Sequence, residues 1–212
     1  MTQVIDFNRL LQLARELLAR PERQILAIAG APGSGKSTLV ARLATTLESE
    51  AVAVLPMDGF HYDDAVLESM GRRPWKGAPD TFDVGGLRST LARLRDPEEG
   101  AVAVPVFDRT LEISRGSARI IGAEVRLILA EGNYLLLDNE PWPSLRRHFD
   151  ATVLIHVPEQ DLKRRLRRRW EAYGLSEAQI DFKLEQNDLP NGRLVVESTS
   201  AIDFVLSQTS TQ

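Results

Sequence analysis

The sequence predicts an α/β fold in which a parallel β-sheet is covered by helices on both faces. Short apolar runs typical of buried strands alternate with amphipathic helical stretches along the chain, and this alternation is characteristic of parallel sheets. A glycine-rich loop follows the first of these runs, residues 25–29, and leads into a helical pattern. The chain has 212 residues, of which 43% are hydrophobic, and this is enough for one sizeable core. We therefore expect a single domain over residues 1–212.

The glycine-rich loop satisfies the phosphate-binding pattern G-x-x-x-x-G-K-[ST] from Gly30 to Ser37, with a strand before it and a helix after it. Glycines let backbone N–H groups close around phosphate oxygens, and the positive end of the helix faces the anion. The pattern predicts a P-loop NTPase, in which Lys36 reaches the terminal phosphates and Ser37 holds Mg²⁺. The alternative is a glycine-rich turn without a ligand. The residues expected to bind the nucleotide are Gly30, Ala31, Gly33, Ser34, Gly35, Lys36, Ser37 and Thr38.

Periodicity and turn signals predict the remaining elements. A helix is expected at residues 6–20, with Asp6 as its N-cap and Pro21 after it, packed as an added outer helix. Further strands are expected at residues 51–56, 125–130, 151–157 and 194–196. Further helices are expected at residues 84–95, 159–173 and 176–186, and the two arms of a hairpin at residues 101–107 and 118–121. An apolar segment at residues 202–206 closes the fold, and we expect the tail from Ser207 to fray.

Two acids stand directly after predicted strands. Asp58 follows the strand at residues 51–56, and Glu131 follows the strand at residues 125–130. Parallel sheets bind ligands at the carboxyl ends of their strands, and we expect these two strands to flank the P-loop strand. Phosphoryl transfer needs Mg²⁺ at the phosphates and benefits from a carboxylate that deprotonates the attacking hydroxyl. The two acids are candidates for these tasks; the alternative is that each simply ends a strand in water.

A basic cluster at residues 163–169 lies in a predicted helix. The cluster could be a solvated face, a nucleic-acid patch or a lid that clamps phosphates. The net charge of -4 and the pI near 5.5 disfavour nucleic-acid binding. We expect a lid, in which Arg164 and Arg168 point the same way because they are four residues apart. The apolar face of this helix is expected to carry Leu162, Leu166 and Tyr173.

The segment from Gly71 to Gly86 is polar and rich in glycine and proline. Long structureless segments inside compact domains are more often functional than idle, so we expect this one to form part of an acceptor site or to cover it. His61, close to Asp58, is a candidate for substrate contact or a hydrogen-bonded structural histidine. Trp75 could stack on a substrate, although an ordinary packed indole is the simpler interpretation.

One motif is interpreted as a chance match. Residues Asp83 to Gly86 fit the D-x-x-G switch motif of GTP-binding proteins, but no buried strand precedes them and no N-K-x-D motif occurs in the sequence. The sequence has no cysteine, which excludes disulfides, thiolate zinc sites and cysteine nucleophiles. No apolar run approaches the length of a membrane span. We expect a cytoplasmic protein without membrane insertion.

Several stretches carry a family resemblance: Gly30 to Thr38, Met57 to His61, Lys76 to Asp83, Pro105 to Arg109, Glu131 to Tyr134 and the arginine-rich helix. In these stretches the chain resembles the uridine kinase, pantothenate kinase and phosphoribulokinase group of P-loop small-molecule kinases, and in particular the bacterial fructose transport system kinases. The resemblance implies a nucleoside and nucleotide kinase-like three-layer sandwich. It also implies that Asp58 is the catalytic base, that Glu131 lies near Mg²⁺, and that Arg164 and Arg168 are lid arginines.

The departures from the family pattern concern the acceptor. Gly77 stands where uridine kinases carry an aspartate for the ribose hydroxyls, and Phe107 stands where they carry a tyrosine. Arg109 takes the place of a histidine found in pantothenate kinases. By resemblance, a hydroxylated metabolite such as a sugar is therefore the first expectation for the acceptor.

We expect an ATP-dependent kinase that transfers the γ-phosphoryl group to a hydroxyl of a small molecule, such as fructose or another sugar. The alternatives are a pantothenate or nucleoside kinase, and an ATP-hydrolysing switch that acts on a transporter or another partner. Residues 58–121 are expected to form the acceptor site and residues 159–173 the lid, and a homodimer is left open. A nucleobase slot could involve Asn187 or Asn191. The residues expected in the reaction are Lys36, Asp58, Arg164 and Arg168 for catalysis, Ser37 and Glu131 for Mg²⁺, and His61, Lys76, Asp108 and Arg109 for the acceptor.

Overall fold

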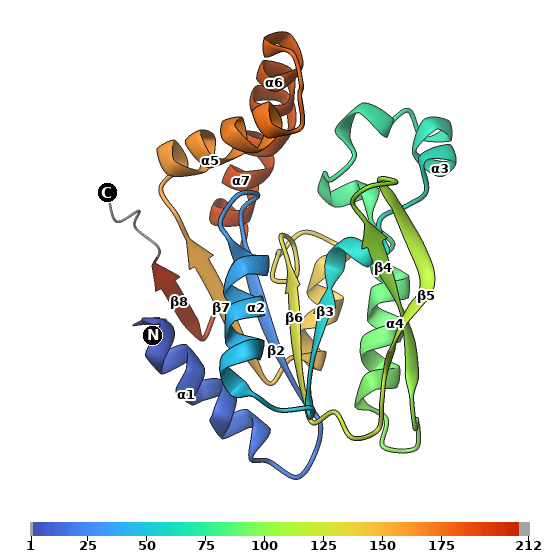
Figure 1. Ribbon diagram of the computed structural model, residues 1–212, viewed down its shortest axis with the longest axis vertical. Helices are drawn as coiled ribbons and strands as arrows, with labels where there is room; N and C mark the ends of the chain where they lie inside the picture. Colours follow the sequence, from blue (N-terminus) through green and yellow to red (C-terminus); the bar gives the residue numbers. More distant parts are fainter. Residues whose placement is uncertain (1, 208–212) are drawn as a thin grey trace.

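The computed structural model describes residues 2–207, and its centre is a six-stranded sheet in which every pairing is parallel (Figure 1). The order of the strands across the sheet is β1-β8-β7-β2-β6-β3. Their bounds are β1 Gln3–Ile5, β8 Phe204–Ser207, β7 Ala151–His156, β2 Gln24–Gly30, β6 Leu127–Gly132 and β3 Val52–Pro56. The predicted fold class, an α/β P-loop architecture, is confirmed.

The central strand β2 shows how the sheet is buried on both faces. All seven of its residues are buried, and they alternate between two apolar cores: Ile25, Ala27 and Ala29 face one, while Leu26 and Ile28 face the other. This alternation is the period of two that a strand imposes on its side chains. Both sides of the sheet therefore need covering elements.

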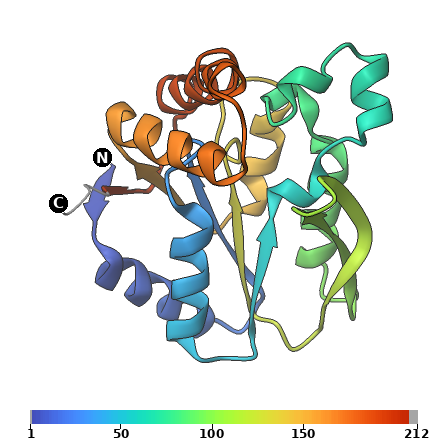
Figure 2. The same ribbon diagram turned by 45° about the horizontal axis from the view of Figure 1, so that its top comes forward.

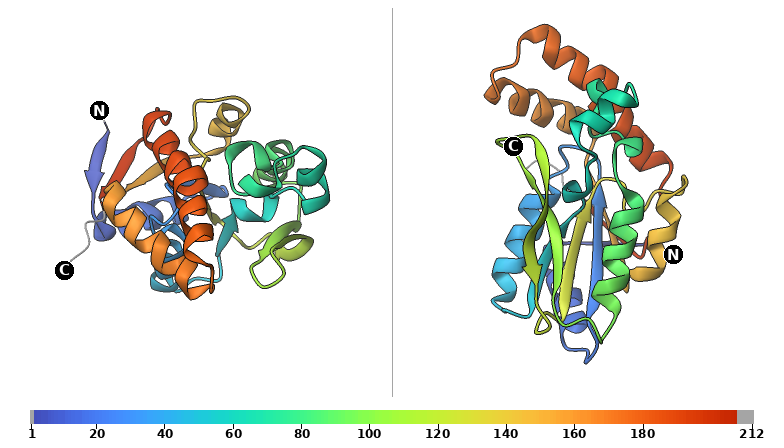
Figure 3. Two further views of the ribbon diagram at one scale, coloured as in Figure 1. Left: turned by 90° about the horizontal axis from the view of Figure 1, so that it is seen from above. Right: turned by 90° about the vertical axis from the view of Figure 1, so that its right-hand side faces the viewer.

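Helices cover each face, as the view along the sheet in Figure 3 shows. One face packs against α1 (Phe7–Leu18) and α2 (Lys36–Leu47), while α5 (Glu159–Ala172) lies beyond the carboxyl ends of the strands (Figure 1). The other packs against α4 (Val84–Arg95) and a 3₁₀ helix, η4 (Trp142–His148). Among the helices of residues 2–207, none has both the length and the apolar character that a bilayer crossing requires.

The N-terminal segment forms the predicted helix and an additional strand. In α1 the side chain of Asp6 accepts a hydrogen bond from the backbone N–H of Arg9 at 2.8 Å, so Asp6 is the N-cap, as predicted. Residues 3–5 form the edge strand β1, which pairs with β8 and was not predicted from the sequence. A three-residue strand is too short to show a period, and only its neighbour β8 defines it.

The C-terminal region differs from the prediction. Residues 194–196, expected as the final strand, lie in α7 (Leu189–Glu197). Three apolar residues in a row cannot distinguish a strand from a helix, and only Val195 of this run is buried. The predicted closing segment is the true last strand, β8, and Ser207 ends it. The tail beyond Ser207, residues 208–212, lies outside the described residues.

Apart from α4, which packs on one face of the sheet, the segment between β3 and β6 lies beside the sheet next to β3 (Figure 2). Its two-stranded antiparallel hairpin, β4 (Val102–Asp108) and β5 (Ile113–Ile121), confirms the predicted hairpin. Residues 71–86 were expected to include a long structureless stretch, but residues 73–75 and 79–81 form 3₁₀ helices; the helix expected at residues 84–95 is confirmed as α4. The elements before the hairpin are η1 (Met57–Phe60), α3 (Asp64–Ser69), η2 (Arg73–Trp75) and η3 (Pro79–Thr81).

The D-x-x-G match has a structural explanation. Asp83 is the N-cap of α4, and its side chain accepts the backbone N–H of Gly86 at 2.7 Å. A β-carbon on Gly86 would lie 2.2 Å from Asp83 Oδ2, so the glycine leaves room for the capping carboxylate in the position it takes here. The aspartate and the glycine of this motif therefore serve one helix terminus.

Candidate active site

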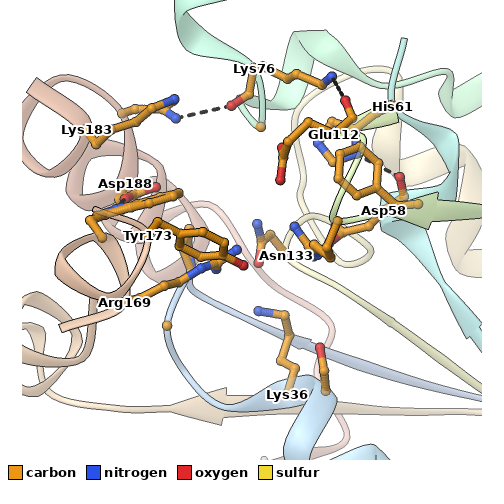
Figure 4. A pocket seen from close by; sticks show the side chains of 18 of the residues that line it. Lys36, Asp58, His61, Lys76, Glu112, Asn133, Arg169, Tyr173, Lys183 and Asp188 are labelled. Atoms are coloured by element: carbon orange, nitrogen blue, oxygen red, sulfur yellow. Dashed lines mark hydrogen bonds and ion pairs between the residues drawn. The ribbon is translucent and has the colours of Figure 1, made fainter. Parts of the chain in front are cut away.

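A cavity of about 570 Å³ lies at the carboxyl ends of β2, β6 and β3 (Figure 4). It is bounded by the P-loop, by η1, by the tip of the β4–β5 hairpin, and by the helices that follow β7. The lining residues of this region come from α5, α6 (Glu177–Lys183) and the π-helical turn η5 (Leu184–Asp188), with the α5–α6 connection. The view from above in Figure 3 shows these helices on one side and the segment from η1 to the hairpin on the other. The cavity therefore joins the phosphate-binding loop to the predicted acceptor segment.

The P-loop turns through two glycines in the left-handed conformation, Gly33 (φ 78°) and Gly35 (φ 86°). The second is the N-cap of α2 and forms no side-chain cap, so the first N–H groups of the helix face the cavity. The loop closely approaches α5, because a β-carbon on Gly33 would lie 2.9 Å from Leu166 Cγ. These features are those of an anion-binding loop at a helix N-terminus.

Lys36 is held by the loop itself. Its Nζ donates to the carbonyl oxygens of Gly30 at 2.9 Å and Ala31 at 3.0 Å. Burial lowers the pKa of Lys36 to about 8, and the charges of Glu131 and Asp58 oppose this shift. Of the residues predicted to bind the nucleotide, Gly33, Gly35, Lys36, Ser37 and Thr38 line the cavity. Gly30, Ala31 and Ser34 lie beneath it and shape the loop.

Ser37 and Glu131 lie side by side, although they come from distant parts of the sequence. Ser37 Oγ donates to Glu131 Oε1 at 3.0 Å. Burial raises the pKa of Glu131, while the neighbouring charge of Lys36 lowers it. Within residues 2–207, no three His, Cys, Asp or Glu side chains come together as a metal cluster. A hydroxyl next to one carboxylate nevertheless suits Mg²⁺, which takes few protein ligands and the oxygens of a bound phosphate.

Asp58 lies in η1, directly after β3, and lines the cavity. Its carboxylate forms an ion pair with Arg109 from the hairpin tip. The expectation that the strands before Asp58 and Glu131 flank the P-loop strand is half wrong. Strand β6, which carries Glu131, pairs with β2, but β3 pairs only with β6 among the described strands. Pairing between strands that are far apart in the sequence sets this order, and the sequence does not show which strands pair.

On the acceptor side, His61 and Lys76 both line the cavity. The His61 ring lies between Phe82 and Phe107, with ring centroids 4.0 and 4.8 Å away. Lys76 is buried, and its Nζ contacts Asp64 Oδ1 at 2.6 Å and the carbonyl oxygen of Glu112 at 2.5 Å. The ammonium of Lys76 therefore already has two hydrogen-bond acceptors within the protein.

Asp108 is not brought into the cavity lining. Its Oδ1 accepts the backbone N–H groups of Thr110 at 3.0 Å and Leu111 at 3.1 Å, and its Oδ2 faces Arg115. These bonds close the hairpin turn. The predicted acceptor contact at Asp108 is therefore replaced by a structural role, while its neighbour Arg109 does line the cavity.

The structure does not bring the predicted pair of lid arginines to the cavity. Arg164 forms an ion pair with Asp161 at 2.6 Å, and Arg168 is not among the lining residues. Arg169 lines the cavity instead, and Arg165 Nη1 lies 3.4 Å from the carbonyl oxygen of Ser34. The spacing of four residues that predicted Arg164 and Arg168 fits Arg165 and Arg169 equally well.

The apolar stripe of α5 distinguishes the two pairs. Leu162 and Leu166 are buried, Leu166 against Gly33 of the P-loop. Arg165 and Arg169 each follow one of these leucines by three residues, which places them beside that face. Tyr173 was expected on the same stripe, but α5 ends at Ala172. Tyr173 is half exposed beyond the last turn and lines the cavity.

The turn after α6 supplies two further lining residues: Asn187, which was expected as a candidate for a nucleobase slot, and Asp188, which the sequence did not single out. Trp170 Nε1 donates to Asp188 Oδ2 at 2.7 Å, and burial raises the pKa of Asp188. Asn187 Nδ2 lies 3.3 Å from the carbonyl oxygen of Lys76 and so connects the two sides of the cavity. Asn191, the other candidate for a nucleobase slot, donates to Asn187 Oδ1 at 2.9 Å. Both asparagines lie in helical turns and not beside the last strand.

Comparison with known proteins gives several relatives that are named as kinases. No family model matches the chain. A solved "putative fructose transport system kinase" from Silicibacter sp. TM1040 is 38% identical with a TM-score of 0.87, over 95% of this chain and 98% of that one. "Putative uridine kinase C227.14" of Schizosaccharomyces pombe is 31% identical over 97% of this chain and 92% of its own length. A pantothenate kinase of Sorangium cellulosum is 32% identical over 66% of this chain and 47% of its own length.

Proposed function

Because the chain belongs to the uridine kinase, pantothenate kinase and phosphoribulokinase group of P-loop kinases, we propose that it transfers the γ-phosphoryl group of ATP to a hydroxyl group of a small metabolite. One observation carries this proposal. A single cavity is lined by Lys36 and Ser37 of the P-loop and also by Asp58, His61 and other groups of the acceptor segment. A nucleotide and a second small molecule can therefore meet in it.

The P-loop holds the donor in this proposal. Backbone N–H groups at the start of α2 bind phosphate oxygens, and Lys36 exchanges its bonds to the loop carbonyls for contact with the terminal phosphates. Arg169, with the nearby Arg165, stabilises the negative charge of the transferring group from the lid. Such cationic contacts act most strongly where water is excluded.

Ser37 and Glu131 are the residues that would hold Mg²⁺. The ion would neutralise negative charge on the phosphates of the nucleotide. The hydrogen bond between the two side chains keeps their oxygens together before any ligand binds. The raised pKa of Glu131 reflects burial, and a nearby cation would favour its ionised form.

Asp58 is the proposed general base. Its carboxylate faces the same cavity as Lys36, and the two groups influence each other electrostatically. A carboxylate beside the terminal phosphate can accept the proton of an attacking hydroxyl. Arg109 holds this carboxylate in place through the ion pair.

For the acceptor we propose a sugar or another hydroxylated metabolite, with a nucleoside or pantothenate as the alternative. The solved relative from Silicibacter carries the name of a fructose transport system kinase, which supports a sugar. We also propose that the protein works in the cytoplasm, where ATP is available. A homodimer stays a prediction, which light scattering on the purified protein tests.

The direct test is an assay of ADP release with Mg²⁺ and ATP against sugars, nucleosides and pantothenate. We expect one class of acceptor to stimulate turnover and to yield a phosphate monoester, which ³¹P NMR detects. ATP hydrolysis that no acceptor stimulates and that yields only inorganic phosphate would contradict the proposal. It would favour the alternative of an ATP-hydrolysing switch that acts on a partner such as a transporter.

A further inference from the structure

We propose that Glu112 selects the acceptor, and that it does so by accepting hydrogen bonds from hydroxyl groups of an uncharged polyhydroxy compound. This inference rests on the proposed kinase function and narrows its substrate class. Glu112 lies at the tip of the β4–β5 hairpin and lines the cavity. Figure 4 shows its side chain extending into the cavity, across from Lys183 and above Asn133.

The backbone of Glu112 is held in an unusual conformation. Its φ is +54°, in the left-handed region that non-glycine residues adopt only at a cost. The carbonyl oxygen of Glu112 accepts a hydrogen bond from Lys76 Nζ at 2.5 Å. Lys76 is only 8% exposed and is anchored in turn by Asp64. A buried, paired ammonium therefore fixes the backbone from which the Glu112 carboxylate reaches inward.

Three side chains on the acceptor side can accept hydrogen bonds from a ligand: Asp58, His61 and Glu112. His61 Nδ1 lies 2.8 Å from the carbonyl oxygen of Asp58, and because a carbonyl only accepts, Nδ1 carries the proton. Burial lowers the pKa of His61, so the ring is neutral and Nε2 is an acceptor. With the carboxylates of Asp58 and Glu112, this side of the cavity offers sites for donors. Hydroxyl groups are donors that also suit phosphoryl transfer.

The cations on the same side are already engaged with acids of the protein. Arg73 and Lys76 both contact Asp64, at 2.7 and 2.6 Å, and Arg109 pairs with Asp58. A carboxylate on the acceptor would face Glu112 on this side, and the cations there already contact carboxylates of the protein. The arrangement therefore disfavours an anionic acceptor and favours an uncharged one.

The rings of Phe82 and Phe107 also line the cavity. They offer apolar surface next to the acceptor groups of His61 and Glu112. A polyhydroxy compound has both kinds of surface, since its C–H groups can pack on an aromatic ring while its hydroxyls donate to carboxylates. Each hydroxyl bound by a built acceptor contributes to discrimination against analogues that lack it.

The test uses acceptors in matched pairs that differ by a carboxylate: glycerol with D-glycerate, and D-glucose with D-gluconate. D-Fructose, D-ribose, uridine and pantothenate complete the panel. For the wild-type protein we expect transfer to at least one uncharged polyol, with kcat/KM about tenfold or more above that of its carboxylate counterpart or of pantothenate. Glu112→Gln should raise the KM for that polyol about tenfold, because the neutral amide accepts fewer hydrogen bonds. Its kcat and its KM for ATP should stay within about twofold.

Leu111→Ala is the matched control. Leu111 is the neighbour of Glu112 at the same exposed turn but does not line the cavity, so its variant should keep the wild-type KM. An unchanged acceptor KM in Glu112→Gln, or a wild-type preference for the carboxylate acceptors, overturns the role of Glu112 and leaves the kinase function standing. A panel without any acceptor-dependent phosphate monoester overturns the kinase function itself.

Discussion

Arg109 forms an ion pair with Asp58, so a residue at the tip of the β4–β5 hairpin holds the carboxylate that follows β3. The two residues are 51 positions apart in the sequence. Both line the cavity, and the pair joins the two-stranded hairpin to the edge of the six-stranded sheet. The proposed base is therefore held by the same segment that would form the proposed acceptor site.

Replacing Arg109 tests what this pair does. Arg109→Ala releases the carboxylate of Asp58, and we expect ATP hydrolysis without acceptor to rise, because the carboxylate can then accept a proton from water. Arg115→Ala is the control, since Arg115 pairs with Asp108 on the same hairpin and outside the cavity. The same basal ADP release in both variants would show that the pair does not restrain Asp58.

Replacing Asp58 tests the base. Asp58→Asn keeps the size of the side chain and removes its ability to accept a proton. We expect acceptor-dependent transfer to fall about 10²- to 10⁴-fold, with ATP affinity unchanged in a calorimetric titration. Full transfer activity in a folded variant with normal ATP affinity would rule out this role.

The two faces of α5 give a paired prediction. Arg169→Ala should lower kcat by about 10²- to 10³-fold, because the guanidinium at the cavity stabilises charge on the transferring group. Arg164→Ala should leave kcat within about twofold, since Arg164 is paired with Asp161 and such exposed pairs contribute little. Steady-state kinetics on both variants measure this difference in kcat. A larger loss of kcat in Arg164→Ala than in Arg169→Ala would favour the lid arginines predicted from spacing.

Gly33 should not tolerate a β-carbon. At φ 78° the left-handed conformation strains an alanine, and its β-carbon would lie 2.9 Å from Leu166 Cγ. We expect Gly33→Ala to lose about 1–3 kcal/mol of unfolding free energy and to bind ATP more weakly. Gly100→Ala, where nothing lies within 4 Å of an added β-carbon, is the control and should unfold like the wild type. Equal urea midpoints for the two variants would contradict the account of the loop.

Asp188 gives a pH-dependent prediction for stability. Burial raises the pKa of Asp188 in the folded protein, so its contribution to stability is complete below the unfolded pKa and is lost as the pH rises through the folded pKa. Asp188→Asn removes this loss and keeps an oxygen for Trp170 Nε1. We expect the melting temperature of the variant relative to the wild type to increase between about pH 4.5 and pH 7. A difference in melting temperature that does not change with pH would contradict a raised pKa of Asp188 in the folded protein.

The elements that the sequence predicted well have strong local signals. The P-loop, the helix α1 with its Asp6 cap and the buried strand β2 each follow from residues that are neighbours in the chain. The run at residues 194–196 was misassigned because three apolar residues fit either period. Glu112 was missed because an exposed acid in a hairpin turn has no distinguishing pattern, and the bond from Lys76 that places it spans 36 residues.

The sequence by itself determined that the protein has a phosphate-binding loop between a strand and a helix, since glycine spacing and the helix N-terminus act within one short stretch. It also determined that Asp58 and Glu131 stand at the carboxyl ends of strands. Only the tertiary structure decided that β6 lies between β2 and β3, that α5 turns Arg169 and not Arg168 to the cavity, and that Glu112 reaches the acceptor side. The physical reason is that periodicity fixes which residues share a face, whereas packing against distant segments fixes where that face points.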